Sequence, residues 1–127
     1  MVKFLVDTDV TVDFLRGVEA SVSFFETHVS EIGFSTITHS ELFAGARSVS
    51  ERAELGQFLS QFETFSVTAS IARGAGELKY KESHKRGIGL ADCLIAVTAI
   101  EAKRTLVSLK KKHFDRLVEL LVPYKKQ

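Results

Sequence analysis

An apolar stretch of strand length near the start of the chain ends abruptly in acidic residues. Residues 3–6 read Lys-Phe-Leu-Val, and Asp7, Thr8 and Asp9 follow at once. Apolar side chains on both sides of a strand are typical of a parallel sheet that is covered on both faces. Because ligand sites of such sheets lie at the carboxyl ends of the strands, we expect Asp7 and Asp9 at the edge of a cleft.

The rest of the chain alternates helical and strand-like patterns. This alternation predicts an α/β fold, an α/β/α sandwich with a short parallel sheet of four or five strands. The length of 127 residues predicts a single domain spanning residues 1–127. We expect helices at 10–16, 18–28, 36–48, 49–62, 69–86 and 91–103, and further strands at 31–35, 65–67, 105–108 and 117–122.

Composition excludes several classes of protein. The chain has one cysteine, Cys93, which rules out an internal disulfide and a cysteine-rich zinc site. No apolar run approaches the roughly 18 residues of a transmembrane helix. The first residues turn acidic too soon for a signal peptide, so we expect a cytoplasmic protein without a membrane partner.

The net charge of +1 conceals an asymmetry along the chain. Residues 1–63 carry 4 basic and 10 acidic side chains, whereas residues 64–127 carry 13 basic and 6 acidic ones. An acidic site beside a basic surface suits a metal centre that acts on a polyanion. The alternative is that the basic residues only solubilise exposed helices.

Three acidic residues from distant segments are candidate ligands of one divalent cation. They are Asp7, Glu41 and Asp92, with Asp9 as a further candidate. Mg²⁺ or Mn²⁺ prefers carboxylate and water oxygens, and it removes the repulsion that clustered acids otherwise suffer. A bound ion can also activate a water and stabilise the charge that builds on a phosphoryl group during phosphodiester hydrolysis.

Each of these acids also has a structural interpretation. Asp7 or Asp9 can cap a helix that begins at Val10. Glu41 completes a capping-box pattern that begins at Thr38. Asp92 opens an apolar helix, where the helix dipole favours an acid. Spacing alone leaves both interpretations open.

The order of three longer pieces carries a family resemblance. These are Val-Asp-Thr-Asp-Val at 6–10, Ser-Thr-Ile-Thr-His-Ser-Glu-Leu-Phe-Ala-Gly-Ala at 35–46, and Gly-Leu-Ala-Asp-Cys-Leu-Ile-Ala-Val-Thr-Ala at 89–99. With Leu-Val-Ser at 106–108 and the following His-Phe pair at 113–114, they resemble the PIN-domain family over nearly the whole chain. The closest subgroup is the VapC-type toxin ribonucleases.

The resemblance implies a metal-dependent endoribonuclease. Asp7, Glu41 and Asp92 match the three most regular acidic ligands of the family, which would hold Mg²⁺ or Mn²⁺. Thr8 or Ser35 would supply an auxiliary hydroxyl beside the site. The expected partners are an RNA substrate and a VapB-type antitoxin, and the expected assembly is a homodimer.

The chain departs from the family pattern after its fourth predicted strand. The family often has a further acid or an asparagine there, where this chain has Lys110. The departure puts a second metal ion and full activity in doubt, although Asp9 could compensate. Lys110, Lys111, Lys112 and Arg86 are candidates for holding RNA phosphates, with an ordinary solvated surface as an equally weighted alternative.

Two other functions stay open on the sequence. Residues 7–11, Asp-Thr-Asp-Val-Thr, resemble the first motif of haloacid-dehalogenase-type phosphatases, in which Asp7 would be the nucleophile. That chemistry needs a late acidic pair after a strand, whereas Asp92 precedes a helix. The other possibility is a non-catalytic PIN-like module that binds RNA or protein, and Lys110 keeps it open.

Overall fold

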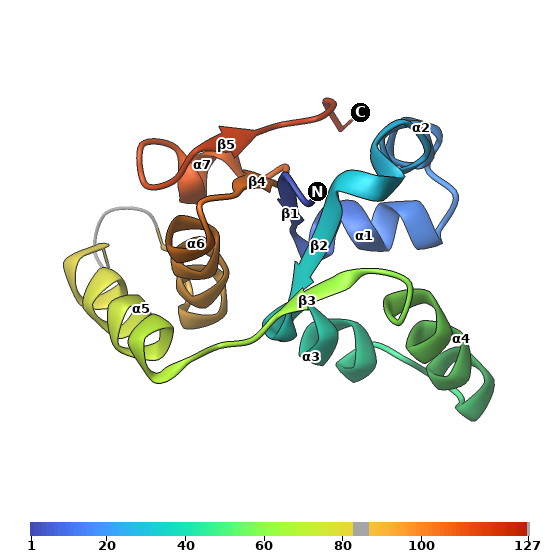
Figure 1. The fold of residues 1–127 in the computed structure, drawn as a ribbon, viewed down its shortest axis with the longest axis horizontal. Coiled ribbons are helices and arrows are strands. Elements are labelled where there is room, and N and C mark those ends of the chain that lie inside the picture. The colour runs from blue at the N-terminus through green and yellow to red at the C-terminus, as the bar shows by residue number, and fades with distance from the viewer. Residues whose placement is uncertain (83–86, 127) are drawn as a thin grey trace.

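A five-stranded parallel sheet forms the centre of the molecule in a computed structural model, which describes residues 1–82 and 87–126. Helices cover both faces of the sheet, with α1 to α4 on one side and α5, α6 and α7 on the other (Figure 1). The elements are β1 Phe4–Val6, α1 Thr8–Leu15, α2 Glu19–His28, a 3-10 helix Val29–Glu31, β2 Ile32–Ser35, α3 Thr36–Ala44, α4 Val49–Leu59, β3 Glu63–Phe65, α5 Ala69–Glu82, α6 Leu90–Ala102, β4 Thr105–Val107, α7 Lys111–Phe114 and β5 Leu120–Leu121. The predicted α/β/α class is confirmed.

The strand order β3-β2-β1-β4-β5 places β1 in the middle of the sheet. From β1 the chain steps outward through β2 to β3, and then crosses to the other side of β1 to form β4 and β5. Right-handed crossovers put the helices of these two halves on opposite faces. The order of the strands therefore reverses between β1 and β4.

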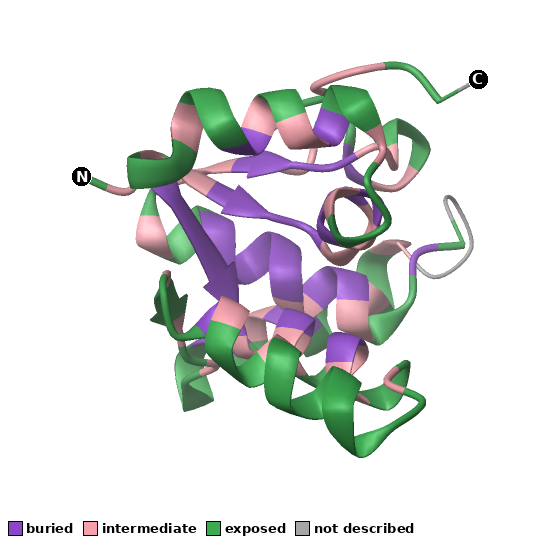
Figure 2. Cartoon of the chain, turned by 90° about the vertical axis from the view of Figure 1, so that its right-hand side faces the viewer, coloured by how far each residue is buried: buried purple, intermediate pink, exposed green. Residues whose placement is uncertain are grey.

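Alternate side chains of the central strands enter two separate hydrophobic cores. Leu5 and Leu106 pack with buried residues of α5 and α6, whereas Val6 and Val107 pack with those of α1 to α4. All four side chains are fully buried. The continuous apolar runs of these strands thus reflect burial on both faces, as a parallel sheet requires. Figure 2 shows the same pattern, with buried strands inside and exposed outer faces of the helices.

Close approach of two strands explains a glycine in β2. A Cβ atom on Gly33 would lie 2.8 Å from the Phe65 ring and 3.1 Å from the backbone oxygen of Glu63. Gly33 and Glu63 are partners in the parallel register of β2 and β3. A side chain at this position would therefore push β3 away from the sheet.

Several predicted boundaries were wrong at the edges of the sheet. The third strand was expected at 65–67 but occupies Glu63–Phe65, and the last is only Leu120–Leu121. The first helix begins at Thr8 rather than Val10.

None of the helices in residues 1–82 and 87–126 is long and apolar enough to cross a membrane.

Candidate active site

The candidate site lies where the strand order reverses. Asp7 directly follows β1, and Ser108 directly follows its parallel neighbour β4. In open α/β sheets, the crevice at the carboxyl ends of the strands beside such a reversal is the usual place for a ligand. The topology therefore brings residues about 100 positions apart to one edge of the sheet.

Asp7 is both a helix cap and the buried centre of the site. Its Oδ1 accepts a hydrogen bond from the backbone N–H of Thr8 at 2.7 Å, and its Oδ2 accepts one from the Ser108 hydroxyl at 2.7 Å. The side chain is fully buried. Burial and, next, the charge of Asp9 raise the pKa of Asp7 to about 7. The capping and site interpretations are thus compatible at this residue.

Asp9 binds the loop that follows β4. Its Oδ2 accepts from the backbone N–H of Leu109 at 3.0 Å, and its Oδ1 accepts from that of Val10 at 2.7 Å. Burial raises the pKa of Asp9 more than these hydrogen bonds lower it. Since both oxygens are engaged by backbone N–H groups, Asp9 acts on the site chiefly through its charge and by fixing the loop.

Glu41 points to the site from the middle of α3. The capping-box interpretation is wrong, because Ser35 caps this helix by accepting from the N–H of Ile37 at 3.0 Å. Glu41 instead accepts a hydrogen bond from the Thr8 hydroxyl at 2.5 Å, and the hydroxyl oxygens of Thr8 and Thr38 lie 3.1 Å apart. The Thr8 hydroxyl therefore lies beside the Glu41 carboxylate, whereas that of Ser35 is used by the cap.

Asp92 approaches from the other face of the sheet. It lies in the first turn of α6, which begins after Gly89, so it also has the favourable position that the helix dipole gives an acid. Its Oδ2 lies 2.8 Å from Nδ1 of His113, and its Oδ1 lies 3.1 Å from Nζ of Lys110. Two basic side chains from the β4–β5 segment thus converge on one carboxylate.

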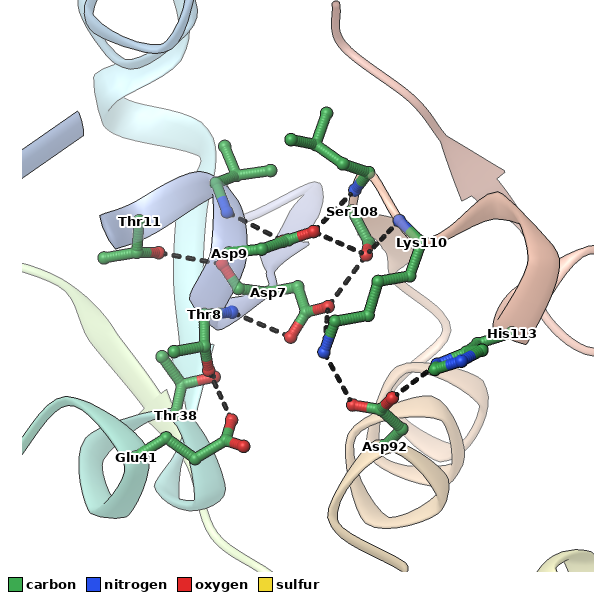
Figure 3. Close-up of polar contacts among 12 residues, drawn as sticks. Asp7, Thr8, Asp9, Thr11, Thr38, Glu41, Asp92, Ser108, Lys110 and His113 are labelled. Atoms are coloured by element: carbon green, nitrogen blue, oxygen red, sulfur yellow. Dashed lines mark hydrogen bonds and ion pairs between the residues drawn. The ribbon is translucent and has the colours of Figure 1, made fainter. Parts of the chain in front are cut away.

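The ammonium group of Lys110 lies between two of the predicted ligands (Figure 3). Its Nζ is 3.1 Å from Asp92 and 3.9 Å from Oδ2 of Asp7. Burial by itself would lower the pKa of Lys110, but the charges of Asp7 and Asp92 raise it above the ordinary value. The lysine is therefore positively charged at neutral pH, and its charge is held inside the acidic site.

The ligand atoms available at this site are of the type that a hard cation prefers. Asp7 and Asp92 share one positive charge, that of Lys110, and Glu41 is linked to the same edge through Thr8. Carboxylate oxygens are the ligands that Mg²⁺ and Mn²⁺ take. Among the described residues, however, no three His, Cys, Asp or Glu side chains form a ready-made ion shell. Loading a cation would require side chains to move.

Three residues that contribute to this arrangement were missed by the sequence analysis. Ser108 follows a strand of the parallel sheet just as Asp7 does, and this signal could have identified it. Thr38 and His113 do not follow a strand directly, and each reaches its partner only through the tertiary fold, although His113 belongs to the His-Phe pair that contributes to the family resemblance. Arg86, predicted to bind RNA, lies outside the described residues.

The other two predicted RNA-binding residues lie on the surface. Lys111 and Lys112 are exposed at the start of α7, immediately after Lys110. Their side chains are thus accessible beside the site, whereas the ammonium group of Lys110 contacts the acids.

Comparisons with known proteins agree with this fold. The PIN domain family matches residues 4–120. Ribonuclease VapC19 of Mycobacterium tuberculosis is 39% identical over 125 residues, which cover 94% of this chain and 98% of the relative. Ribonuclease VapC10 of the same species is 36% identical, with 94% of this chain and 92% of the relative covered.

Solved structures show the same fold at lower identity. A toxin–antitoxin complex from Klebsiella pneumoniae matches with a TM-score of 0.83 and 22% identity, over 98% of this chain and 100% of that one. DNA-bound VapBC from Salmonella typhimurium matches with a TM-score of 0.80 and 22% identity, over 95% and 98%.

The chain belongs to the PIN-domain family. Within that family it groups with the VapC-type proteins, as the resemblance of its sequence motifs implied. The haloacid-dehalogenase alternative is therefore set aside.

Proposed function

We propose that this chain is a metal-dependent endoribonuclease, a toxin of the VapC type that hydrolyses RNA phosphodiester bonds. Its relatives of 39% and 36% identity are named ribonucleases over almost their full length. The observation that carries the proposal is the meeting of Asp7 and Asp92 at the reversal of strand order, with Glu41 linked through Thr8.

The proposed ligands are Asp7, Glu41 and Asp92, and the proposed ion is Mg²⁺ or Mn²⁺. PIN-domain ribonucleases as a class depend on divalent metal ions. When bound, such an ion supplies an activated water and positive charge for the phosphoryl oxygens. The carboxylate and hydroxyl oxygens present at this edge of the sheet suit that ion by their chemistry.

The neighbouring residues hold the carboxylates in place. The Ser108 hydroxyl and the Thr8 N–H fix both oxygens of Asp7, and His113 orients Asp92. Such outer contacts set the direction and basicity of ligand groups. Burial disfavours the charged form of Asp7, so a cation placed beside this carboxylate would stabilise its charged form.

The proposed partners are RNA, a VapB-type antitoxin and a second copy of the chain. Structural neighbours named as VapBC or toxin–antitoxin complexes support the antitoxin. Exposed Lys111 and Lys112, next to the site, offer positive charge to RNA phosphates. An RNA substrate in turn supports a cytoplasmic location.

The test is RNA cleavage by the purified chain with Mn²⁺ or with EDTA. We expect Asp7→Asn and Asp92→Asn each to lower the cleavage rate by about a hundredfold or more, because each removes a proposed ligand. Glu26→Gln is the control, since it removes one exposed acid from α2. Wild-type rates in both site variants would show that the site is assigned wrongly.

One observation favours a second candidate, a non-catalytic RNA-binding module. The Lys110 ammonium already neutralises the acids that a catalytic metal would need. RNA binding by the wild-type chain without cleavage in either Mg²⁺ or Mn²⁺, and unchanged in Asp7→Asn, would support this candidate over the nuclease.

A further inference from the structure

The acidic site contains a cation that the chain itself provides. Nζ of Lys110 lies within hydrogen-bond distance of Asp92 Oδ1 and 3.9 Å from Asp7 Oδ2 (Figure 3). The side chain enters from the loop between β4 and α7 and is 34% exposed. The ammonium group thus contacts the buried acids, while other parts of the same side chain are in contact with solvent.

A metal ion and this ammonium would compete for the same oxygen atoms. A divalent ion lies about 2.0–2.6 Å from each oxygen ligand, so an ion bound by both carboxylates would occupy the gap that Nζ occupies. Two cations within a few ångströms repel strongly in a partly buried site. Because lysine is a point charge on a flexible four-carbon stem, its ammonium group can turn outward and leave the gap to the ion, towards which the two carboxylates would then close.

Among residues 1–82 and 87–126, His113 and Asp9 are ionisable groups near the gap, but both are engaged elsewhere. His113 contacts the far oxygen of Asp92, and Asp9 is held by backbone N–H groups. Ser108 also fixes the loop beside the lysine, since its Oγ accepts from the Lys110 backbone N–H at 3.1 Å. The backbone of residue 110 is thus anchored, and only the side chain has to move.

We propose that the Lys110 ammonium and a divalent cation are alternative occupants of the gap between Asp7 and Asp92, so that Lys110 sets the metal affinity of the site. This inference rests on the metal site of the proposed function. Its consequence is a site that stays neutralised without metal and loads only when the concentration of the cation is high enough to displace the lysine.

The test is calorimetric titration of the full-length chain with Mn²⁺. We expect Lys110→Met to tighten Mn²⁺ binding by about tenfold or more, because the competing charge is gone. Lys111→Met is the matched control: it removes the same charge from the next, exposed residue, and its affinity for Mn²⁺ should equal that of the wild type. Lys110→Met affinity equal to or weaker than that of wild type would overturn the inference.

Two further measurements separate this inference from the site assignment. Asp7→Asn should lose Mn²⁺ binding; if it binds as wild type does, the proposed site itself is wrong, whatever Lys110→Met shows. The Lys110 side-chain resonances in wild-type protein should shift when diamagnetic Mg²⁺ is added, which needs no variant that must fold. Resonances unmoved at Mg²⁺ saturation would also overturn the inference.

Discussion

Replacing Asp7 by asparagine should stabilise the metal-free protein at neutral and alkaline pH. The side chain is fully buried, and its burial beside Asp9 raises its pKa from 3.8 to about 7. Asparagine has the same shape and can still accept from the N–H of Thr8 and hydrogen-bond to Ser108. The variant therefore removes a buried charge without leaving a cavity.

The size and sign of the effect follow from the shift in pKa. Between about pH 4 and pH 7, folded Asp7 keeps a proton that the unfolded chain has released, so the stability of the wild type falls as the pH rises. A shift of about three pKa units corresponds to about 4 kcal/mol, reached in full above pH 7. We expect the free energy of unfolding of Asp7→Asn to exceed that of the wild type by up to about 4 kcal/mol at pH 8, and by less than about 1 kcal/mol at pH 4.

The assay is urea unfolding in EDTA at both pH values. Glu26→Gln, which alters an exposed acid of α2, should change the free energy of unfolding by no more than about 0.5 kcal/mol at either pH. An Asp7→Asn protein that is no more stable than wild type at pH 8 would refute the reasoning, because ionised Asp7 would then carry no cost in the fold.

Two further predictions test the sheet and the basic surface. Gly33→Ala should lower the free energy of unfolding by about 1–3 kcal/mol, because its Cβ would lie 2.8 Å from the Phe65 ring. An unchanged urea midpoint would show that β3 can shift without a loss of stability. Lys111→Ala combined with Lys112→Ala should reduce the slope of log RNA affinity against log salt by about 1.4, since each phosphate contact on a single strand contributes about 0.7. An identical slope would assign both lysines to solvation.

The central strands could be predicted from the sequence because their burial leaves a local signal. These strands are mainly apolar and are covered on both faces, and they comprise Phe4–Val6, Ile32–Ser35 and Thr105–Val107. The edge strands lack that signal. Glu63–Phe65 is largely exposed, and its position is set by its pairing with β2 rather than by its own side chains.

The acidic site was predictable only in part. A carboxylate that ends a buried strand made Asp7 a candidate, but local sequence could not distinguish a metal ligand from a helix-terminal acid at Glu41 and Asp92. The structure shows why the distinction fails, since Asp7 caps α1 and also faces the site. The contacts of Lys110 left no local pattern in the sequence, because Asp92 lies 18 positions and Asp7 lies 103 positions before it.

The most direct measurement of the central claim is a crystal structure of the chain soaked in Mn²⁺, with anomalous diffraction data collected at the manganese edge. The account predicts an anomalous peak between Asp7 and Asp92, within ligand distance of both carboxylates, and the Lys110 ammonium displaced towards solvent. Under Mn²⁺ conditions in which the chain cleaves RNA, a peak elsewhere, or a Lys110 side chain still between the two acids, would contradict it.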